Sequence, residues 1–304
     1  MQSGSGGDPG APDGRLSRRA LLAGGAVTLV SASAAFPALT ALADGPTERF
    51  MAHRAGSRET VDHAAWDELL SAYVVPGADG LNRVDYRGFK AKGHAALKAY
   101  TGRLAAVDPA TLDRPEQFAY WANLYNAKTI DIVLDAYPVA SIRDIQIGGG
   151  LVGLLKQSVG AGGPWQAPVV TVKSTQLSLD DIEHQILRPV FADARVHYAV
   201  NCASIGCPNL ATKAWRGAGL DTDLDAAARA FVNHPRGVRA DNGSVIASSI
   251  YSWFMADFGG TPASVLDHIR RFAGPDLLKV LADRTGIDSY EYDWTLNDTT
   301  PRKS

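Results

Sequence analysis

Apolar residues recur at helical spacing through much of the chain, and shorter alternating runs separate these segments. The spacing is clear in residues 61–74, where Trp66, Leu69, Leu70 and Tyr73 fall on one helical face. Comparable spacing predicts further helices over residues 89–106, 179–187, 221–233, 261–273 and 276–284. Most of the chain is therefore expected to be helical.

The longest predicted helix lies in the middle of the sequence. Asp113 and Pro115 suit its cap and first turn, and the helical pattern stops before Pro138 because proline disfavours helical geometry in the preceding residue. Apolar residues surround much of this segment instead of forming one stripe. A helix that is apolar on most sides is buried, so we expect it at the centre of the protein.

Strands are predicted where apolar and polar residues alternate over a short run. The candidates are residues 168–172 (PVVTV), 195–201 (RVHYAVN), a hairpin over 238–248 turning at Asn242-Gly243, and 289–297 (SYEYDWTLN). Helices outnumber strands and do not alternate regularly with them, which predicts the α+β class: a mainly helical single domain around a small β-sheet. We place this domain at residues 60–299, between a linker at 44–59 and a tail at 300–304.

Residues 147–168 are rich in glycine and are expected to form a loop or flap. They lack the Gly-Lys-Ser/Thr ending of a phosphate-binding loop, so we do not expect a nucleotide phosphate there.

The first 43 residues differ in character from the rest. A Gly/Pro/Ser-rich start, expected to be disordered, leads to Arg18 and Arg19 and then to a weakly apolar run that ends in small residues before Asp44. This pattern predicts a twin-arginine signal peptide over residues 1–43, and hence an exported protein, periplasmic or extracellular, that uses the twin-arginine export machinery. The alternative is a retained membrane helix, which Pro37 and the scarcity of leucine and isoleucine disfavour. We expect no stable membrane span after cleavage.

Composition and charge narrow the possible partners. The chain is 46% hydrophobic and 20% charged with a formal net charge of −2, which is ordinary for a globular protein. Such a balance does not suggest binding to nucleic acid or to an acidic membrane surface. We expect no cofactor.

Two asparagines interrupt the apolar pattern of the central helix. Asn123 and Asn126 are three residues apart, so their side chains are neighbours on one face. Buried amides need hydrogen-bond partners, and either of two roles satisfies them: bracing nearby loop backbone, or donating to a reacting group in a site.

A carboxylate and an imidazole follow on the helix over residues 179–187. Ser178 and Asp181 form a capping pattern at its start. Glu183 falls in the inward stripe, where it must pair with another group or have a raised pKa, and a structural or a functional role is equally compatible with that position. His184 is in register with Asp180 and Arg188, which favours an ion-pair lattice on a solvated face.

The only two cysteines, Cys202 and Cys207, follow the predicted strand RVHYAVN. A straight strand would put His197 roughly 16 Å from Cys202, so His184 is the better candidate for a base. An exported protein can form a Cys202–Cys207 disulfide, which we favour; a nucleophilic Cys202 is the second reading. A metal site would need more ligands at suitable spacing, and we predict none.

Five blocks together resemble a known family. They are FAYWANLYNA (118–127), LSLDDIEHQILR (177–188), RVHYAVNCASIGCPNL (195–210), SWFMADF (252–258) and YDWTLN (292–297). In this order they resemble the signature blocks of the domain-of-unknown-function family 547, over roughly residues 60 to 297. The resemblance marks Trp121, Asn123, Tyr125, Asn126, Glu183, His184, Arg188, His197, Asn201, Cys202, Ser204, Cys207 and Pro208. It implies one shared site but no activity.

Two functions from different classes remain open. The first is a cysteine-dependent hydrolase or acyl transferase acting at a carbonyl of a small-molecule or peptide-like substrate. In it Cys202 is the nucleophile, His184 the base, Glu183 the orienting acid, and Asn123 or Asn126 the oxyanion donor. Binding contacts are expected from Trp121, Arg188, His197, Asn201 and Ser204. The second is a non-catalytic module that binds a ligand or partner and is made rigid by the disulfide. A protein that cycles the two cysteines between redox states is a third reading.

Overall fold

The computed structural model describes residues 45–147 and 163–300. Contacts divide the chain into residues 1–43 and residues 44–304, and only the second unit contains described residues. The predicted signal peptide and most of the predicted glycine-rich loop therefore lie outside the described residues.

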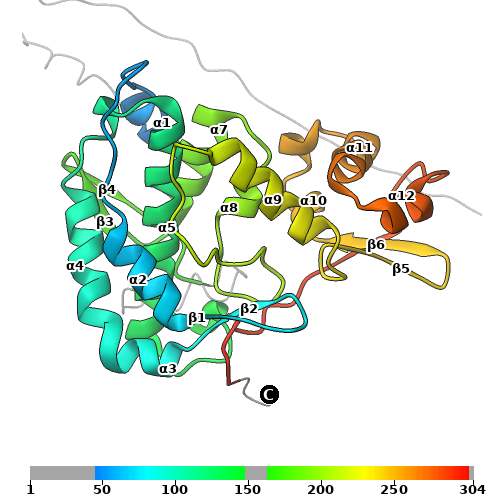
Figure 1. The fold of residues 1–304 in the computed structure, drawn as a ribbon, viewed down its shortest axis with the longest axis horizontal. Helices are drawn as coiled ribbons and strands as arrows, with labels where there is room; N and C mark the ends of the chain where they lie inside the picture. Colours follow the sequence, from blue (N-terminus) through cyan, green and yellow to red (C-terminus); the bar gives the residue numbers. More distant parts are fainter. Residues whose placement is uncertain (1–44, 148–162, 301–304) are drawn as a thin grey trace, which may run out of the picture. The chain divides into compact units, whose positions relative to one another are not determined.

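Helix α5 (Arg114–Ala136) forms the buried centre of the first of two hydrophobic cores, as its sequence predicts (Figure 1). Asp113 caps it by accepting a hydrogen bond from the backbone N–H of Glu116 at 3.1 Å, and the helix stops two residues before Pro138. Helices α4 (His94–Ala105) and η4 (Asp181–Leu187) pack against it, and α2 (Ala64–Tyr73) packs on α4. Burial of a large side chain such as Trp121 contributes about 2–3 kcal/mol to this core.

Short helical segments complete the surroundings of the first core. They are α1 (Pro46–Phe50), α3 (Tyr86–Gly88), η1 (Phe89–Gly93), η2 (Pro109–Thr111), η3 (Ile142–Asp144), α7 (Arg188–Phe191) and α8 (Val196–Ala199). The predicted linker at 44–59 is partly structured, because α1 lies within it. Phe50 at the end of α1 is buried edge-on against Trp121, with ring centroids 5.0 Å apart.

The second core is built from the last third of the chain. Its elements are α9 (Leu220–Val232), α10 (Ile250–Trp253), η5 (Met255–Phe258), α11 (Pro262–Phe272), α12 (Pro275–Leu281) and the strands β5 (Val238–Asp241), β6 (Ser244–Ser248) and β7 (Ser289–Glu291). Helix α11 shows how sequence sets these elements: Thr261 caps it by accepting from the N–H of Ser264 at 3.1 Å, and its buried face carries Val265, Leu266 and Ile269.

Within residues 45–147 and 163–300 the strands form three small sheets, which confirms the α+β class. Antiparallel pairs are β1 (Val74–Pro76) with β2 (Asn82–Val84), β3 (Val170–Val172) with β4 (Thr175–Leu177), and β5 (Val238–Asp241) with β6 (Ser244–Ser248), while β7 (Ser289–Glu291) runs parallel to β6. The predicted hairpin is confirmed: Asn242 and Gly243 both have positive φ (47° and 85°), as a two-residue type I′ turn requires.

One predicted strand is wrong. Residues 195–201 contain helix α8 instead, because the carbonyl and carboxylate of Asp193 accept from the N–H groups of Val196 (3.0 Å) and Arg195 (2.8 Å) and start a turn. All four residues of α8 are buried. A short helix that is buried on every side has no separate apolar and polar faces, so its sequence shows no helical spacing. A helix advances about 1.5 Å per residue, less than half the advance of a strand, which brings His197 nearer to the cysteines than predicted.

Residues 292–299 connect segments that are far apart in the sequence. The N–H groups of Leu296 and Asn297 donate to the carbonyls of Ala140 and Ala203, at 2.8 and 3.1 Å. The carbonyl of Asn297 in turn accepts from the N–H of Val84 at 2.8 Å. This segment therefore joins β2, the end of α5 and the loop that carries the cysteines.

In the described part of the chain, no helix has the length and apolar character needed to cross a membrane.

Candidate functional site

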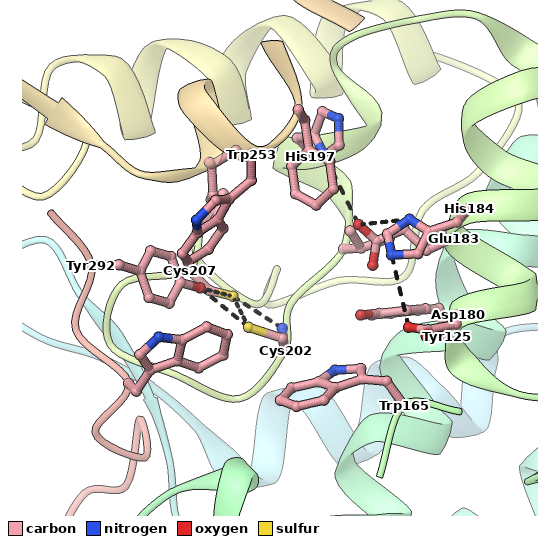
Figure 2. Close-up of a pocket in the computed structure, with 15 residues that line it drawn as sticks. Tyr125, Trp165, Asp180, Glu183, His184, His197, Cys202, Cys207, Trp253 and Tyr292 are labelled. Atoms are coloured by element: carbon pink, nitrogen blue, oxygen red, sulfur yellow. Dashed lines mark hydrogen bonds and ion pairs between the residues drawn. The ribbon is translucent and has the colours of Figure 1, made fainter. Parts of the chain in front are cut away.

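A pocket of about 190 Å³ lies where the two hydrophobic cores meet (Figure 2). It is lined by Tyr125, Trp165, Asp180, Glu183, His184, His197, Val200, Cys202, Cys207, Pro208, Ile250, Trp253, Phe254, Tyr292 and Trp294. Figure 2 shows Cys202, Cys207 and Tyr292 on one side of the pocket and Glu183, His184 and Asp180 on the other. Two chemically different walls therefore face a shared space.

Two asparagines hold the cysteine loop in place. The side chain of Asn126 accepts from the N–H of Asn201 (2.8 Å) and donates to the carbonyl of Ala199 (2.9 Å), which anchors the loop to α5. Asn201 then accepts from the N–H of Ala203 (2.8 Å) and donates to the carbonyl of Pro208 (2.7 Å), so one side chain joins both ends of the loop. Ala203 has a φ of 63°, a conformation unfavourable for alanine that this network maintains.

Gly206 allows the loop to approach the segment that carries Tyr292. Its N–H donates to the carbonyl of Asp293 at 2.8 Å, and a Cβ at this position would lie 2.8 Å from the backbone nitrogen of Asp293 and 3.0 Å from the Tyr292 ring. Only glycine fits this approach without displacing backbone. The contact brings the Tyr292 hydroxyl to the two sulfur atoms.

The two thiols and the Tyr292 hydroxyl form a closed hydrogen-bonded cluster. The sulfurs are 2.6 Å apart, and the hydroxyl is 3.2 Å from Cys202 Sγ and 3.0 Å from Cys207 Sγ. The backbone N–H of Cys202 donates to Cys207 Sγ at 3.1 Å, and this donor makes the pair asymmetric. The hydroxyl of Ser204 lies 2.9 Å from that of Tyr292 and 3.4 Å from Cys202 Sγ.

This asymmetry decides which sulfur carries negative charge. Burial opposes ionisation of Cys207, but hydrogen bonds from the Cys202 thiol, the Tyr292 hydroxyl and the Cys202 N–H lower its pKa to about 7. The hydrogen bond to Cys207 and burial raise the pKa of Cys202 well above its usual range. At neutral pH Cys202 therefore keeps its proton, while Cys207 is thiolate in part of the molecules.

The predicted Cys202–Cys207 disulfide is wrong: both cysteines are free thiols. The loop needs no covalent closure, because Asn201 already joins its two ends. Each sulfur instead takes part in hydrogen bonds with the other and with Tyr292.

The opposite wall begins on η4, which is a π-helix instead of the predicted α-helix. The predicted cap is confirmed, since the N–H of Asp181 donates to Ser178 Oγ (3.0 Å) and the N–H of Ser178 donates back to the Asp181 carboxylate (2.8 Å). The wider turn of a π-helix, often found at functional sites, places Glu183 and His184 together on the pocket.

Asp257 anchors this wall from behind. Its carboxylate accepts from Arg188 through Nε (2.6 Å) and Nη2 (3.1 Å), and from His197 Nε2 at 2.7 Å. Burial opposes ionisation, but these hydrogen bonds lower the pKa of Asp257 well below its usual range. The Phe254 ring lies against both partners, 4.3 Å from the His197 ring centroid and 4.8 Å from the Arg188 guanidinium carbon. His197 and Arg188 are thereby fixed in position.

The nitrogens of His184 are directed away from the thiols. Its Nδ1 accepts from Arg188 Nη1 at 3.2 Å, and its Nε2 faces the Asp180 carboxylate at 3.7 Å (Figure 2). Both ring nitrogens of His184 are therefore directed to groups other than the thiols. Within the described residues, the hydrogen-bond partners of Cys202 Sγ are Ser204, Cys207 and Tyr292.

Aromatic rings line the rest of the pocket. Trp253, Tyr292 and Trp294 are in mutual contact, with ring centroids 4.7 to 5.6 Å apart, and Trp165 continues the wall at 5.8 Å from Trp294. Trp253 is 49% exposed, unusually high for tryptophan, and so marks the mouth of the pocket.

A family model supports the resemblance seen in the sequence. The model described as "Protein of unknown function, DUF547" matches residues 109–232. This segment of the chain is therefore similar to the DUF547 family. The matched residues include α5, η4 and both cysteines, whereas Trp253 and Tyr292 lie beyond them. Searches among curated proteins and among solved structures found no significant match.

The structure separates the predicted site residues into two groups. Those that line the pocket are Glu183, His184, His197, Cys202 and Cys207. Those that lie behind it are Trp121, Asn123, Asn126, Arg188, Asn201 and Ser204. Trp121 is fully buried in the first core, and Asn123 braces a different loop through Trp215, donating to its carbonyl at 2.8 Å and accepting from its N–H at 3.0 Å.

Several pocket residues were not assigned a role from the sequence, namely Tyr292, Trp165, Trp253, Trp294, Phe254 and, behind the wall, Asp257. Two of the sequence blocks that carry the family resemblance, residues 252–258 and 292–297, contain five of these six, and that composition was the signal available.

One cluster of potential metal ligands occurs away from the pocket among the described residues. His94, Asp131 and Asp135 lie close together, but Lys98 and Lys128 already pair with Asp131 at 2.9 and 2.6 Å. These ammonium groups occupy the positions a cation would take, so this cluster is an ion-pair network.

Proposed function

We propose that the pocket carries out cysteine-dependent hydrolysis or acyl transfer at a carbonyl carbon, with Cys207 as the nucleophile. The observation that supports this proposal most strongly is the geometry of the thiol pair. Three donors converge on Cys207 Sγ, and this sulfur lines a pocket with apolar walls. A thiolate is the reactive form of cysteine, and a pKa of about 7 makes it available at neutral pH. The role first predicted for Cys202 thus passes to its partner.

The proton kept on Cys202 gives this residue the role of acid and then base. Cys207 Sγ attacks the carbonyl carbon, the C=O electron pair moves to oxygen, and the Cys202 thiol loses its acceptor. When the carbonyl re-forms, the leaving group departs with a proton from Cys202 and a Cys207 thioester remains. Water, or another acyl acceptor, then attacks the thioester, its proton passes to the Cys202 thiolate, and Cys207 leaves as thiolate. Burial of Cys202, one of the effects that raise its pKa, also applies in the thioester and favours this uptake of a proton.

Two hydroxyl groups are placed to assist the carbonyl oxygen. The phenol of Tyr292 is within 3.2 Å of both sulfurs, and Ser204 hydrogen-bonds to it at 2.9 Å. A donor beside an attacking sulfur stabilises the negative charge that develops on oxygen. In this scheme Asn126 and Asn201 position the loop instead of contacting the substrate.

The proposal is tested by the pH dependence of alkylation with iodoacetamide under reducing conditions, with peptide mapping of the modified cysteine. Cys207 is expected to react with a midpoint near pH 7, lower than the roughly 8.5 of an ordinary cysteine. In Cys207→Ser, alkylation of Cys202 is expected only at clearly higher pH. If Cys207→Ser instead retains a midpoint near 7, the thiolate is on Cys202, and if neither cysteine reacts near neutral pH the nucleophilic role is wrong.

A binding function without catalysis is the second candidate, and the aromatic lining favours it. Tyr125, Trp165, Trp253, Tyr292 and Trp294 give the pocket a largely apolar surface of the kind that holds small ligands. Here the thiol cluster would serve as a rigid floor. Turnover of thioester or ester substrates that is lost in Cys207→Ser separates catalysis from binding alone.

The proposed site of action is outside the cytoplasm. Arg18 and Arg19, followed by a weakly apolar run that ends before Asp44, support export by the twin-arginine route. N-terminal sequencing of the protein recovered from a host with an active twin-arginine pathway is expected to begin at Asp44. A mature protein that begins at residue 1 and stays in the cytoplasm contradicts this expectation.

A further inference from the structure

We propose that the pocket binds an organic cation, a protonated amine or a quaternary ammonium group, between the Glu183–Asp180 wall and the aromatic rings. This inference deepens the proposed function, on which it rests for the reacting end of the substrate: it makes the substrate a small acyl compound with a positively charged group.

The acid wall carries negative charge that no described lysine or arginine neutralises. Glu183 is only 8% exposed, yet its nearest basic groups are the Nδ1 atoms of His184 and His197, each at 4.0 Å. Asp180 has His184 as its ion-pair partner, at 3.7 Å. A buried carboxylate normally has a close, hydrogen-bonded cationic partner, and Glu183 has no lysine or arginine partner among the described residues. Asp180 is only partly buried beside it, so a cation could approach both carboxylates.

The neighbouring charges are already matched. Arg188 forms a bidentate ion pair with Asp257, at 2.6 and 3.1 Å, and does not reach the carboxylates of Glu183 and Asp180. Burial, together with the charges of Glu183 and Asp181, raises the pKa of Asp180, while His184 opposes this effect. A cation bound beside Asp180 would oppose these effects and favour its ionised form.

The aromatic rings supply the other half of a cation site. Figure 2 shows Trp253 and Trp165 on two sides of the space, with Tyr125 beside the acid wall and Tyr292 beside the thiols. The faces of such rings attract ammonium groups, and boxes of several rings are the usual recognition mode for quaternary ammonium. Arg188 already lies over Phe254 at 4.8 Å, so this part of the protein accommodates a cation against a ring.

Pocket size limits what the cation can belong to. About 190 Å³ is below the 300–1,000 Å³ range of sites for drug-sized ligands, so a small molecule or the end of a larger one fits. With the thiols on one wall and the carboxylates on the other, a cationic group near Glu183 leaves the uncharged end of the ligand facing Cys207 (Figure 2). The structure thereby assigns the acyl group to the thiol side.

The test compares three probes by isothermal titration calorimetry on the full chain under reducing conditions. They are choline, ethanolamine and 3,3-dimethylbutan-1-ol, the last being the uncharged isostere of choline. At least one cation is expected to bind about tenfold or more tightly than the neutral alcohol. Preference for choline or for ethanolamine identifies a quaternary or a primary ammonium ligand. Equal affinity of all three, or no binding of either cation at millimolar concentration, overturns the inference.

Variants test whether binding of the cation depends on the Glu183–Asp180 wall and on the aromatic rings. Glu183→Gln and, should that buried change disturb folding, Asp180→Asn are expected to remove most of the preference for the cation. Trp253→Leu, at a half-exposed position, should weaken both cations several-fold. The matched control is Asp276→Asn, because the side chain of Asp276 is 98% exposed and outside the pocket. An equal loss in the control contradicts the assignment.

The same titration in Cys207→Ser distinguishes the two proposals. If this variant binds the cation while the wild-type thiol proves unreactive, the cation site stands and the proposed chemistry fails. If the wild-type thiol reacts with a midpoint near pH 7 but no cation binds, the chemistry stands and the substrate class is wrong.

Discussion

Asn126 offers the sharpest perturbation, because its two buried hydrogen bonds fix the backbone immediately before Cys202. In Asn126→Ala the N–H of Asn201 loses its acceptor at 2.8 Å, whereas the carbonyl of Ala199 keeps the indole N–H of Trp215 at 3.1 Å. One buried donor is therefore left without a partner. Such a group costs about 1–3 kcal/mol, and the space left by the amide adds to this.

We therefore expect a loss of about 2–3 kcal/mol in the free energy of unfolding. For a domain of this size each kcal/mol lowers the melting temperature by roughly 2–4 °C, so a fall of about 4–12 °C follows. The released loop should also move the N–H of Cys202 away from Cys207 Sγ, which it meets at 3.1 Å. If the pKa of Cys207 then rises by about one unit, its thiolate fraction at pH 7 falls roughly fivefold.

The assay pairs urea unfolding with iodoacetamide alkylation rates, and Asn123→Ala serves as the matched control. Asn123 lies one turn earlier on α5 and makes an equivalent pair of buried hydrogen bonds, to the backbone of Trp215. Both variants should lose similar stability, but only Asn126→Ala should slow alkylation of Cys207. Slowing of the same size in both variants, or an unchanged alkylation rate in Asn126→Ala, would refute the reasoning.

Further predictions concern the thiol cluster and a buried histidine. Gly206→Ala should push the loop away from Asp293 and slow Cys207 alkylation at pH 7, and an unchanged rate would show that the close approach is unnecessary. Tyr292→Phe should raise the alkylation midpoint of Cys207, seen as a shifted pH–rate curve without a large change in melting temperature. Burial lowers the pKa of His63 from 6.5 to about 4, so its neutral form stabilises the fold fully above pH 6.5. Between pH 6.5 and pH 4 the free energy of unfolding falls by up to about 3 kcal/mol, because the imidazole takes up a proton in the unfolded chain but not in the folded one. Urea unfolding of His63→Gln should show a smaller fall in the free energy of unfolding over the same pH range.

Sequence patterns predicted the fold best where one local rule acts alone. The central helix, the Asn242-Gly243 hairpin and the Ser178–Asp181 cap all follow from caps, turns and spacing within a few residues. The pattern failed at α8, where burial on every side leaves alternation and helical spacing indistinguishable over four residues. The spacing of apolar residues also could not predict that η4 is a π-helix, because no residue type or spacing marks the change to i+5 hydrogen bonding.

Predicting the site required knowledge of contacts across the chain. Polar breaks in apolar stripes led to Glu183, His184 and the cysteine loop, which do line one pocket. The partner of the thiols, Tyr292, lies 85 residues beyond Cys207 and belongs to a segment that looks like an ordinary alternating strand. The sequence also could not indicate which cysteine is ionised, because that depends on the loop conformation that directs the Cys202 N–H to Cys207 Sγ.

The position of Tyr292 has a consequence for biosynthesis. Ribosomes make the chain from its N-terminus at about 5–20 residues per second, so Cys207 emerges roughly 4–17 seconds before Tyr292. Throughout that interval residues 292–299 are absent, and the hydrogen bonds that they make to Val84, Ala140 and Ala203 cannot form. In the nascent protein Cys207 thus lacks the Tyr292 donor, and the complete thiol cluster forms only when residues 292–299 pack against the loop.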